Sequence, residues 1–396
     1  MLNQRQLFFN HVAQTTETPL ALEIEKAEGV YLFDTSGKQY IDLISGISVS
    51  NVGHRHPKVV AAIKDQLDKY MHLMVYGEFI QSPQVQLAKL LADNLPPNLS
   101  SVYFVNSGSE AIEGALKLAK RATGRTELMS FKNAYHGSTQ GSLSIMGSEE
   151  FKNAFRPLLP DTRQIEFNNL EHLKYITEQT ACVVVETIQG EAGAIIPENN
   201  FLKYLRERCT QVGALLVVDE IQCGFGRTGK LFAFEHYGFV PDILCLAKGM
   251  GGGMPIGAFI SSKEIMNTLT NNPILGHITT FGGHPVCCAA ALANLKIIVE
   301  ENLAEGVEAK EYLFRALLKY PNIKPLKGKG LLLSIEFESY EQNKTIIDKC
   351  IEKGLITDWF LFNSNSMRIA PPLIITEEQI RKACEIIVES VNEVIS

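Results

Sequence analysis

The stretch Leu215-Leu216-Val217-Val218-Asp219 decides the fold class, because an uninterrupted apolar run ends there in a carboxylate. A short apolar run of this kind is typical of a strand that is covered on both faces of a parallel sheet. Similar runs occupy the middle of the chain at 102–105, 127–131, 181–185, 243–246 and 256–260. Helical patterns at 110–122 and 201–212 lie between some of them. This alternation predicts an α/β fold with a mostly parallel sheet.

The two ends of the chain predict a second, smaller α/β unit. Near the start, a turn at 35–38 joins two strand-like runs, which is a hairpin signal. After Pro285, helical patterns dominate. We therefore expect a large domain of residues 45–285 and a small domain that combines residues 1–44 with 286–396.

Composition argues against several classes of protein. The 396 residues carry a formal net charge of −7, and basic residues are mixed with acidic ones, so we expect no nucleic-acid partner. No run of about 18 apolar residues occurs, so we expect no membrane span. The 8 cysteines form no CxxC pair, and the chain starts without an apolar leader. These features together favour reduced thiols, a cytoplasmic location and no metal site.

A glycine-rich stretch at 224–229 fits the GxGxxG pattern of dinucleotide-binding proteins. Those glycines should follow a strand directly and open a helix. Here residues 219–223 intervene, and Leu231-Phe232-Ala233-Phe234 is a poor helix start. We interpret 224–229 as a structural turn, with a nucleotide-binding protein as the alternative.

Two charged residues follow strand-like runs in the middle of the chain. Asp219 ends the first run, and Lys248, followed by glycines, comes after the run at 243–246. Open α/β sheets bind ligands at the carboxyl ends of their strands. Burial there disfavours the ammonium form of a lysine, which helps it to form an imine with a carbonyl. A turn or a helix cap would explain either residue alone, but together they indicate a pyridoxal phosphate site.

Pyridoxal phosphate also needs an anion cradle and an aromatic residue against its ring. The stretch Asn106-Ser107-Gly108-Ser109-Glu110-Ala111 lies between a predicted strand and a predicted helix. Its backbone N–H groups and the helix dipole should therefore point at an anion. Tyr135 is the candidate for the stacking residue. A plain helix cap and a packed aromatic are the respective alternatives.

Six motifs, in this order, resemble the class III aminotransferases, the family of the ornithine, acetylornithine, 4-aminobutyrate and putrescine enzymes. They are Asn-Ser-Gly-Ser-Glu-Ala (106–111), Tyr-His-Gly (135–137), Glu-Thr-Ile-Gln-Gly-Glu (186–191), Val-Asp-Glu-Ile-Gln (218–222), Lys248 and Thr-Phe-Gly-Gly-His-Pro (280–285). The resemblance implies the aspartate-aminotransferase fold (fold type I) and pyridoxal phosphate as cofactor. It implies transamination from an amine or amino acid donor to a 2-oxo acid such as 2-oxoglutarate or pyruvate. An aminomutase or racemase of the same fold is the alternative.

The resemblance assigns a role to each matched residue. Lys248 is expected to carry the cofactor as a Schiff base and to move a proton, and Asp219 to pair with the ring nitrogen. Thr280 is expected to reach the phosphate in the neighbouring subunit, which implies a homodimer with shared active sites. The other residues of the expected cofactor site are Ser107, Gly108, Ser109, Tyr135, His136, Glu186 and Gln222.

The resemblance also implies a substrate site. Glu191 and Arg368 match a pair in which the glutamate neutralises the arginine while an ω-amine is bound. The glutamate then releases the arginine to hold the α-carboxylate of glutamate or 2-oxoglutarate. A structural salt bridge is the alternative for Arg368. Tyr76 is a further expected substrate contact.

One departure from the family bears on the amino donor. Enzymes for ornithine, acetylornithine and 4-aminobutyrate usually have an arginine after the aromatic-His-Gly triplet, whereas this chain has Ser138. The loss of that cation favours a donor without a carboxylate at that end, such as a diamine, unless Arg156 or another basic residue replaces it. Ile47 stands where the ornithine enzymes carry a tyrosine, which argues against ornithine. An acetylornithine, ornithine or 4-aminobutyrate aminotransferase remains the alternative.

Overall fold

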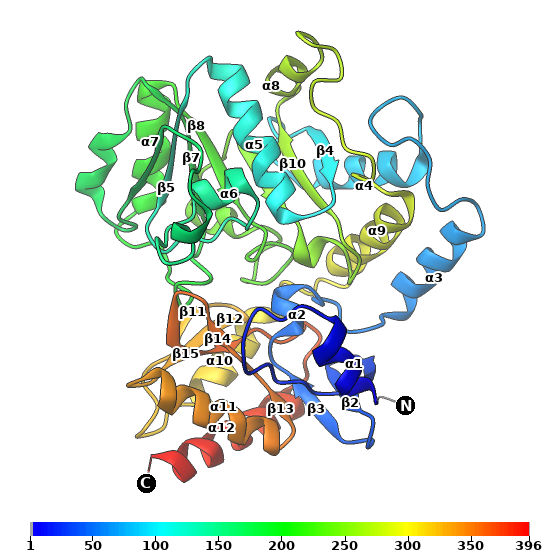
Figure 1. Ribbon diagram of the computed structural model, residues 1–396, viewed down its shortest axis with the longest axis vertical. Coiled ribbons are helices and arrows are strands. Elements are labelled where there is room, and N and C mark those ends of the chain that lie inside the picture. Colours follow the sequence, from blue (N-terminus) through cyan, green and yellow to red (C-terminus); the bar gives the residue numbers. More distant parts are fainter. Residues whose placement is uncertain (1–2, 396) are drawn as a thin grey trace.

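The computed structural model describes residues 3–395 and has two parts, a large sheet with helices on both faces and a smaller α/β part (Figure 1). Within these residues the large sheet has seven strands, in the order β4 (Ser101–Val105), β10 (Gly257–Ser261), β9 (Ile243–Leu246), β8 (Leu215–Asp219), β7 (Thr180–Glu186), β5 (Glu127–Phe131) and β6 (Thr162–Ile165). Strand β10 is antiparallel to both of its neighbours, and the strands from β9 to β6 are parallel. The predicted α/β fold with a mostly parallel sheet is confirmed.

Helices cover both faces of the large sheet. On one face, α5 (Gly108–Thr123) packs its apolar side against β9 and β10. The second face carries α7 (Phe201–Val212), α4 (Ser82–Asp93) and α9 (Pro285–Glu300), with α3 (Pro57–Leu67) packed against α9. The shorter helices are α6 (Gln140–Ser144) and α8 (Lys263–Met266). This double cover explains why β8 and β9 have uninterrupted apolar sequences.

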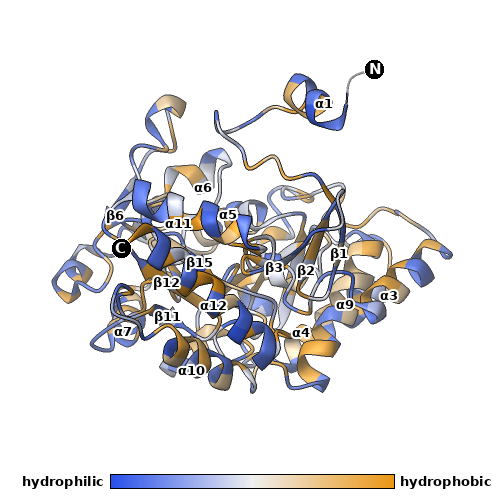
Figure 2. Cartoon of the chain, turned by 90° about the horizontal axis from the view of Figure 1, so that it is seen from below, coloured by the Kyte–Doolittle hydropathy of each residue, from blue (hydrophilic) through white to orange (hydrophobic). Residues whose placement is uncertain are grey.

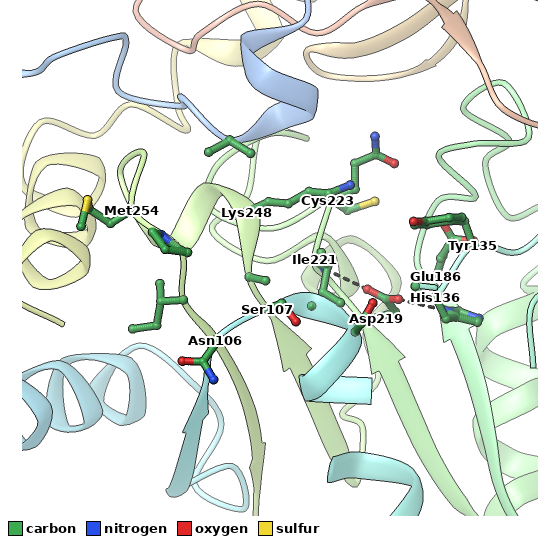
Figure 3. Close-up of a pocket in the computed structure, with 18 of the residues that line it drawn as sticks. Asn106, Ser107, Tyr135, His136, Glu186, Asp219, Ile221, Cys223, Lys248 and Met254 are labelled. Atoms are coloured by element: carbon green, nitrogen blue, oxygen red, sulfur yellow. Dashed lines mark hydrogen bonds and ion pairs between the residues drawn. The ribbon is translucent and has the colours of Figure 1, made fainter. Parts of the chain in front are cut away.

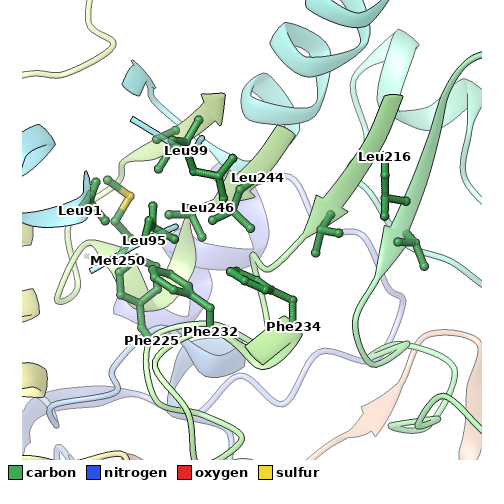
Figure 4. Packing of buried hydrophobic residues seen from close by; sticks show 14 of the residues in the cluster. Leu91, Leu95, Leu99, Leu216, Phe225, Phe232, Phe234, Leu244, Leu246 and Met250 are labelled. Carbon is green, nitrogen blue, oxygen red and sulfur yellow. The ribbon is translucent and has the colours of Figure 1, made fainter. Parts of the chain in front are cut away.

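The core on the second face also fixes the turn that follows β9. Leu244 and Leu246 of β9 lie in one cluster with Phe225, Phe232 and Met250 (Figure 4). Met250 ends the short 3₁₀ helix Lys248–Met250 and is fully buried. The turn that carries Lys248 is therefore anchored in the core at its far end.

The smaller part joins the two ends of the chain. Strand β13 (Leu355–Ile356) pairs in parallel with β3 (Gln39–Asp42). Strand β3 forms the predicted hairpin with β2 (Tyr31–Asp34), and β1 (Ile24–Glu28) pairs with the other edge of β2. A second sheet has the order β11 (Lys327–Lys329), β12 (Leu332–Glu336), β15 (Asn363–Ile369) and β14 (Trp359–Phe360). The helices of this part are α10 (Val307–Leu317), α11 (Tyr340–Glu352) and α12 (Glu377–Val394).

The division into residues 45–285 and residues 1–44 with 286–396 stays a prediction. One apolar cluster contains residues of the N-terminal strands together with residues of α10, α11 and α12, which favours it. Most of α9, however, follows residue 285 and packs in the cluster on the large sheet, to which its buried residues Cys288 and Leu295 belong.

Two short helices lie outside these layers. Helix α1 (Gln4–His11) has no buried residue and stands away from the body of the molecule (Figure 2). Helix α2 (Ser45–Ser48) lies between the large and the small part (Figure 1). Among residues 3–395, no helix is long and apolar enough to cross a membrane.

Candidate active site

A cavity of about 410 Å³ opens where the carboxyl ends of β8 and β9 meet the N-terminus of α5 (Figure 3). Open α/β sheets bind ligands at this edge. Of the residues expected at the cofactor site, those that line the cavity are Ser107, Gly108, Ser109, Tyr135, His136, Glu186, Asp219, Gln222 and Lys248. The fold thus brings together residues that come from five separate stretches of the sequence.

Asp219 and Lys248 extend from neighbouring strands. Asp219 is the last residue of β8 and pairs in register with Cys245 of β9, and Lys248 comes shortly after β9 ends. Asp219 Oδ2 lies 2.8 Å from His136 Nδ1, and Asp219 Oδ1 accepts a hydrogen bond from the backbone N of Ile221 at 3.0 Å. These contacts fix the orientation of the carboxylate.

The side chain of Lys248 reaches across the cavity (Figure 3). Burial lowers the pKa of Lys248 below its ordinary value, and the positive charge of Arg368 acts in the same direction. The carboxylates of Glu191 and Asp219 oppose this shift in part. The lowered pKa increases the share of free amine near neutral pH, and the free amine is the form that attacks a carbonyl.

The N-terminus of α5 provides the predicted anion cradle. Ser107 is the N-cap, and its Oγ accepts from the backbone N of Glu110 at 3.2 Å. A side chain at Gly108 would force Ile221 to shift, because its Cβ would come within 2.9 Å of Ile221 Cδ1. Backbone N–H groups at the start of a long helix, together with the helix dipole, favour an anion. Ser107 is therefore a helix cap, which was the alternative, and it also lines the cavity, which a cap alone does not explain.

Glu186 connects Tyr135 to the sheet. Its two carboxylate oxygens accept from the backbone N of Tyr135 and the backbone N of Gly190, both at 3.1 Å. Burial, with the charge of Asp219 acting in the same direction, raises the pKa of Glu186 well above its ordinary value. The charged form of Glu186 is thus disfavoured at this place in the site.

The chemistry around the cavity fits pyridoxal phosphate. This cofactor needs an amine, an anion beside its ring nitrogen, donors for its phosphate and an aromatic face. Lys248, Asp219, the start of α5 and Tyr135 offer these groups around one cavity. The volume suits a small phosphorylated ring.

Beside the cavity, Arg368 of β15 is paired with Glu191. Arg368 Nη1 and Nη2 donate to Glu191 Oε1 and Oε2, each at 3.0 Å. Gln222, which lines the cavity, donates from Nε2 to Glu191 Oε1 at 3.3 Å. Burial tends to raise the pKa of Glu191, but the charge and hydrogen bonds of Arg368 outweigh it, so this pKa lies below its ordinary value. The two side chains therefore form a buried, ionised pair next to the cavity.

Three expected residues lie away from the cavity. Tyr76 lines a second cavity together with Thr279, and Thr280 is exposed on the same loop as Thr279. Ile47 lies in α2, where it is partly buried and has a φ of 64°. Within residues 3–395, nothing brings Tyr76 or Thr280 to the lining of the first cavity.

Ser138 lies next to Tyr135, and its hydroxyl oxygen is 3.2 Å from the Tyr135 hydroxyl oxygen. The ring of Phe362 lies near that of Tyr135, with 6.2 Å between the ring centroids. Arg156, the basic residue that could replace an arginine at position 138, forms an ion pair with Glu149 at 2.5 Å. The surroundings of Ser138 are thus aromatic and hydroxylic rather than cationic.

The stretch 224–229 forms turns, as predicted, and lies outside the anion cradle. Its Arg227 is fully buried and donates to Leu331 O at 3.1 Å and to Asn51 Oδ1 at 2.6 Å, so it ties the large part to the smaller one. Among residues 3–395, no group of three or more histidine, cysteine, aspartate or glutamate side chains is arranged to hold a metal ion.

Several residues of this site were not expected from the sequence. Ile221 and Met254 line the cavity, and Ile221 could have been found from its place two positions after Asp219. Asp358 accepts from Arg368 Nε at 2.9 Å. No pattern in the sequence marks Asp358, because the contact depends on how β14 and β15 pair.

Known proteins share this architecture and these motifs. The Aminotransferase class-III family model matches residues 12–391. Acetylornithine aminotransferase from Methanopyrus kandleri is 40% identical over 361 residues, 90% of each chain. Acetylornithine aminotransferase from Archaeoglobus fulgidus is 39% identical over 378 residues, 95% of this chain and 97% of the relative. The solved ornithine aminotransferase from Toxoplasma gondii, which has partial occupancy of pyridoxal phosphate at its active site, matches with a TM-score of 0.90 at 31% identity and covers 98% of this chain and 93% of its own.

Proposed function

The chain belongs to the class III aminotransferase family, and on that premise we propose that its amino donor has no carboxylate at the end that reaches Ser138. Pyridoxal phosphate is the cofactor, and the reaction is transamination from an amine or amino acid to a 2-oxo acid. The observation that carries the proposal about the donor is the neutral, aromatic environment of Ser138.

We assign the chemical roles to the residues around the first cavity. Bound pyridoxal phosphate supplies an aldehyde that condenses with amines and a ring that accepts the electrons of a substrate C–H bond. Lys248 attaches the cofactor and moves the substrate proton through Nζ, for which its lowered pKa is suited. Asp219, oriented by His136, places a negative charge for the ring nitrogen. The start of α5 holds the phosphate, and Tyr135 covers a face of the ring.

A chemical trap tests these roles. Borohydride reduction of the holoenzyme, followed by peptide mass spectrometry, should find the cofactor on Lys248. Lys248→Arg keeps the charge but removes the suitable amine, and kcat should fall by at least about 10³-fold. A cofactor trapped on another lysine would contradict the assignment.

Glu191 and Arg368 are assigned to the two alternating substrates. A bidentate guanidinium suits an α-carboxylate, so Arg368 binds the 2-oxo acid when Glu191 withdraws. When Glu191 is paired with Arg368, the charge of the arginine is neutralised, and an amine donor can enter without repulsion. The connection through Gln222 supports this role, because it places the pair against the cavity wall.

The donor is inferred from what surrounds Ser138. Ser138 is exposed in the single chain, and a carboxylate placed beside it would lie next to the Tyr135 hydroxyl without a cation to pair with. Phe151 extends the aromatic surface, with its ring centroid 5.2 Å from that of Phe362. Arg156 is engaged by Glu149, which Lys152 also contacts at 2.8 Å. A primary alkyl or arylalkyl amine that has a C–H on the carbon bearing nitrogen, or a diamine such as putrescine, fits this surface better than an amino acid.

A second candidate is an acetylornithine aminotransferase. The two archaeal relatives with this name are 40% and 39% identical to the chain over at least nine-tenths of its length. If this is the activity, a group other than residue 138 must bind the α-carboxylate of acetylornithine, and Arg156 would have to leave Glu149 to do so.

Half-reactions with single amines distinguish the two candidates. The holoenzyme is mixed with glutamate, putrescine, 4-aminobutyrate, ornithine or acetylornithine, and the visible absorbance of the bound cofactor is followed. We expect rapid bleaching with glutamate and putrescine and slow bleaching with acetylornithine. Rapid bleaching with acetylornithine alone would overturn the proposed donor and leave transamination intact.

We also propose that the protein is a homodimer with shared active sites. Thr280 lies outside the first cavity of its own chain, on an exposed loop. That loop contacts the α3–α4 connection, since the ring centroids of His72 and Phe281 are 4.8 Å apart. Together the two segments expose the apolar side chains of Met71, Leu73, Phe79, Ile80, Ile274, Leu275, Ile278 and Phe281. A clustered apolar surface of this kind is typical of an interface. A monomer in equilibrium sedimentation would contradict the proposal.

A cytoplasmic location is the last part of the proposal. Within the described chain the eight cysteines are free and buried, which suits a reducing compartment. Cell fractionation tests it, and recovery of the protein outside the cytoplasmic fraction would contradict it.

A further inference from the structure

Arg368 is held by two separate sets of contacts. Its terminal nitrogens, Nη1 and Nη2, donate to Glu191. Its Nε donates to Asp358 Oδ1 at 2.9 Å. The five N–H groups of a guanidinium point outward in one plane, so the two carboxylates use different donors. Glu191 can therefore withdraw without breaking the contact with Asp358.

The contact with Asp358 is built into the β14–β15 hairpin. The backbone N of Arg368 donates to Asp358 O at 2.9 Å, so the two residues lie opposite each other on paired segments. Arg368 Nη2 also donates to the carbonyl oxygen of Trp359 at 3.3 Å, and Arg368 Cζ lies 4.4 Å from the ring centroid of Phe360. Residues 358–360 thus form a support for Arg368 that does not depend on Glu191.

The charge of Arg368 also requires compensation in both half-reactions. The Arg368 side chain is only 2% exposed. Once Glu191 withdraws, the guanidinium would be a buried charge without a partner until a substrate carboxylate arrives, which is strongly unfavourable. Asp358, whose side chain is 24% exposed, supplies a negative charge that stays in place.

We propose that Asp358 is a positioning residue for the acceptor half-reaction, which keeps Arg368 directed at the cavity while Glu191 is withdrawn. The inference rests on the proposed function, in which Arg368 binds the α-carboxylate of the 2-oxo acid. Asp358 acts through Arg368 and does not touch the substrate. In the donor half-reaction Arg368 stays paired with Glu191, so Asp358 has little influence there.

Asp358→Asn tests the inference, because the amide keeps the size of the side chain and loses its charge. Calorimetric titration of the holoenzyme with glutarate, a five-carbon dicarboxylate that cannot react, measures carboxylate binding without chemistry. We expect the Kd for glutarate to rise about tenfold, as for the loss of a charge-assisted hydrogen bond. The KM for 2-oxoglutarate should rise with it, while the half-reaction with the donor amine changes by less than about twofold.

Two further variants make the outcome decisive. Asp348→Asn is the matched control, because Asp348 forms a partly buried ion pair with Lys344 in the same part of the molecule. It should leave glutarate binding and both half-reactions unchanged. An unchanged Kd for glutarate in Asp358→Asn, or equal losses in both half-reactions, would overturn the inference.

Arg368→Ala separates the inference from the function on which it rests. If glutarate binds Arg368→Ala as tightly as the wild type, Arg368 is not the carboxylate site, and the proposed function fails together with the inference. If Arg368→Ala weakens binding and Asp358→Asn does not, the proposed function stands and only the role of Asp358 is refuted.

Discussion

Glu191 and Arg368 are 177 positions apart in the chain and meet in a two-point ion pair with N–O distances of 3.0 Å. Glu191 Oε2 also accepts from the backbone N of Leu361 at 3.1 Å. The glutamate thus connects the loop after β7, the Leu361 turn and β15. A buried ion pair of this kind is weak support for stability as such, since its desolvation offsets much of the attraction. Its place beside the cavity favours a role in substrate exchange instead.

Replacing Glu191 by glutamine should therefore shift the balance between the two substrates. The amide no longer neutralises Arg368, so glutarate should bind about tenfold more tightly and an amine donor should react about tenfold more slowly. Calorimetry with glutarate and the absorbance-monitored half-reaction with putrescine measure the two effects. If Glu191→Gln weakened glutarate binding and also slowed the reaction with putrescine, Glu191 would have only a structural role.

The missing cation at position 138 leads to a second prediction. Ser138→Arg places a guanidinium next to Tyr135, where it could pair with a donor carboxylate. The ratio of kcat/KM for acetylornithine to that for putrescine should rise by about 10- to 100-fold. The new guanidinium would attract the carboxylate of acetylornithine and repel the second ammonium group of putrescine. Ser138→Ala is the control, and it should leave the ratio unchanged. A ratio that Ser138→Arg does not change would mean that position 138 does not face the donor.

Much of the fold could be predicted because the central strands are buried on both faces. The expected strands at 127–131 and 243–246 coincide with β5 and β9, and the expected helix at 201–212 coincides with α7. Strand β6 was missed, because its sequence Thr162-Arg163-Gln164-Ile165 lies at the edge of the sheet and only Ile165 is buried. This edge strand, unlike β4 at the opposite edge, has no apolar run by which to recognise it.

The site could be predicted only where it follows from the ends of strands. Asp219 and Lys248 end or follow apolar runs, so parallel strands were bound to bring them to one edge. Asp358 could not be predicted from the sequence, because its contact with Arg368 depends on the length of the turn that joins β14 to β15. Thr280 and Tyr76 were expected from the family resemblance alone, and the first cavity of the single chain does not include them.

The acidity of Asp358 leads to a third prediction, about stability. Burial, opposed in part by Arg368, raises the pKa of Asp358 from 3.8 to about 6, and the carboxylates of Glu191 and Asp42 act in the same direction as burial. A carboxyl whose pKa is raised by folding stabilises the fold below its unfolded pKa, and this contribution is lost as the pH rises through about 6. Ionised Asp358 therefore costs stability at neutral pH.

Asp358→Asn should remove this pH dependence. The free energy of unfolding of Asp358→Asn minus that of the wild type should increase by about 1–3 kcal/mol between pH 4.5 and pH 7.5, because each pKa unit corresponds to about 1.4 kcal/mol. Urea unfolding of both proteins at the two pH values measures the difference. A gain at neutral pH together with weaker glutarate binding would show that Asp358 serves the substrate site at a cost to the fold. A difference that stays constant or falls with pH would mean that the carboxyl is not held in its protonated form by folding.

The proposed dimer with shared active sites leads to a fourth prediction, which a site built from one chain alone would not fulfil. Lys248→Ala removes the essential amine from one site, and Thr280→Glu places a negative charge where the partner's phosphate would lie. Each variant alone should be inactive. In a heterodimer of the two, purified with a different tag on each chain, one site combines the intact Lys248 of one subunit with the intact Thr280 of the other.

That heterodimer should recover about half of the activity of the wild-type dimer, because a two-fold symmetric dimer has two equivalent sites and one of them is complete. The control is a heterodimer in which both substitutions lie on the same chain and the other chain is wild type. It should contain no complete site, because each site then lacks either Lys248 or Thr280. If each cavity worked with residues of its own chain only, the results would be reversed: the first heterodimer would be inactive and the control would retain about half of the activity. The pair of heterodimers thus decides whether Thr280 acts across the interface or within its own subunit.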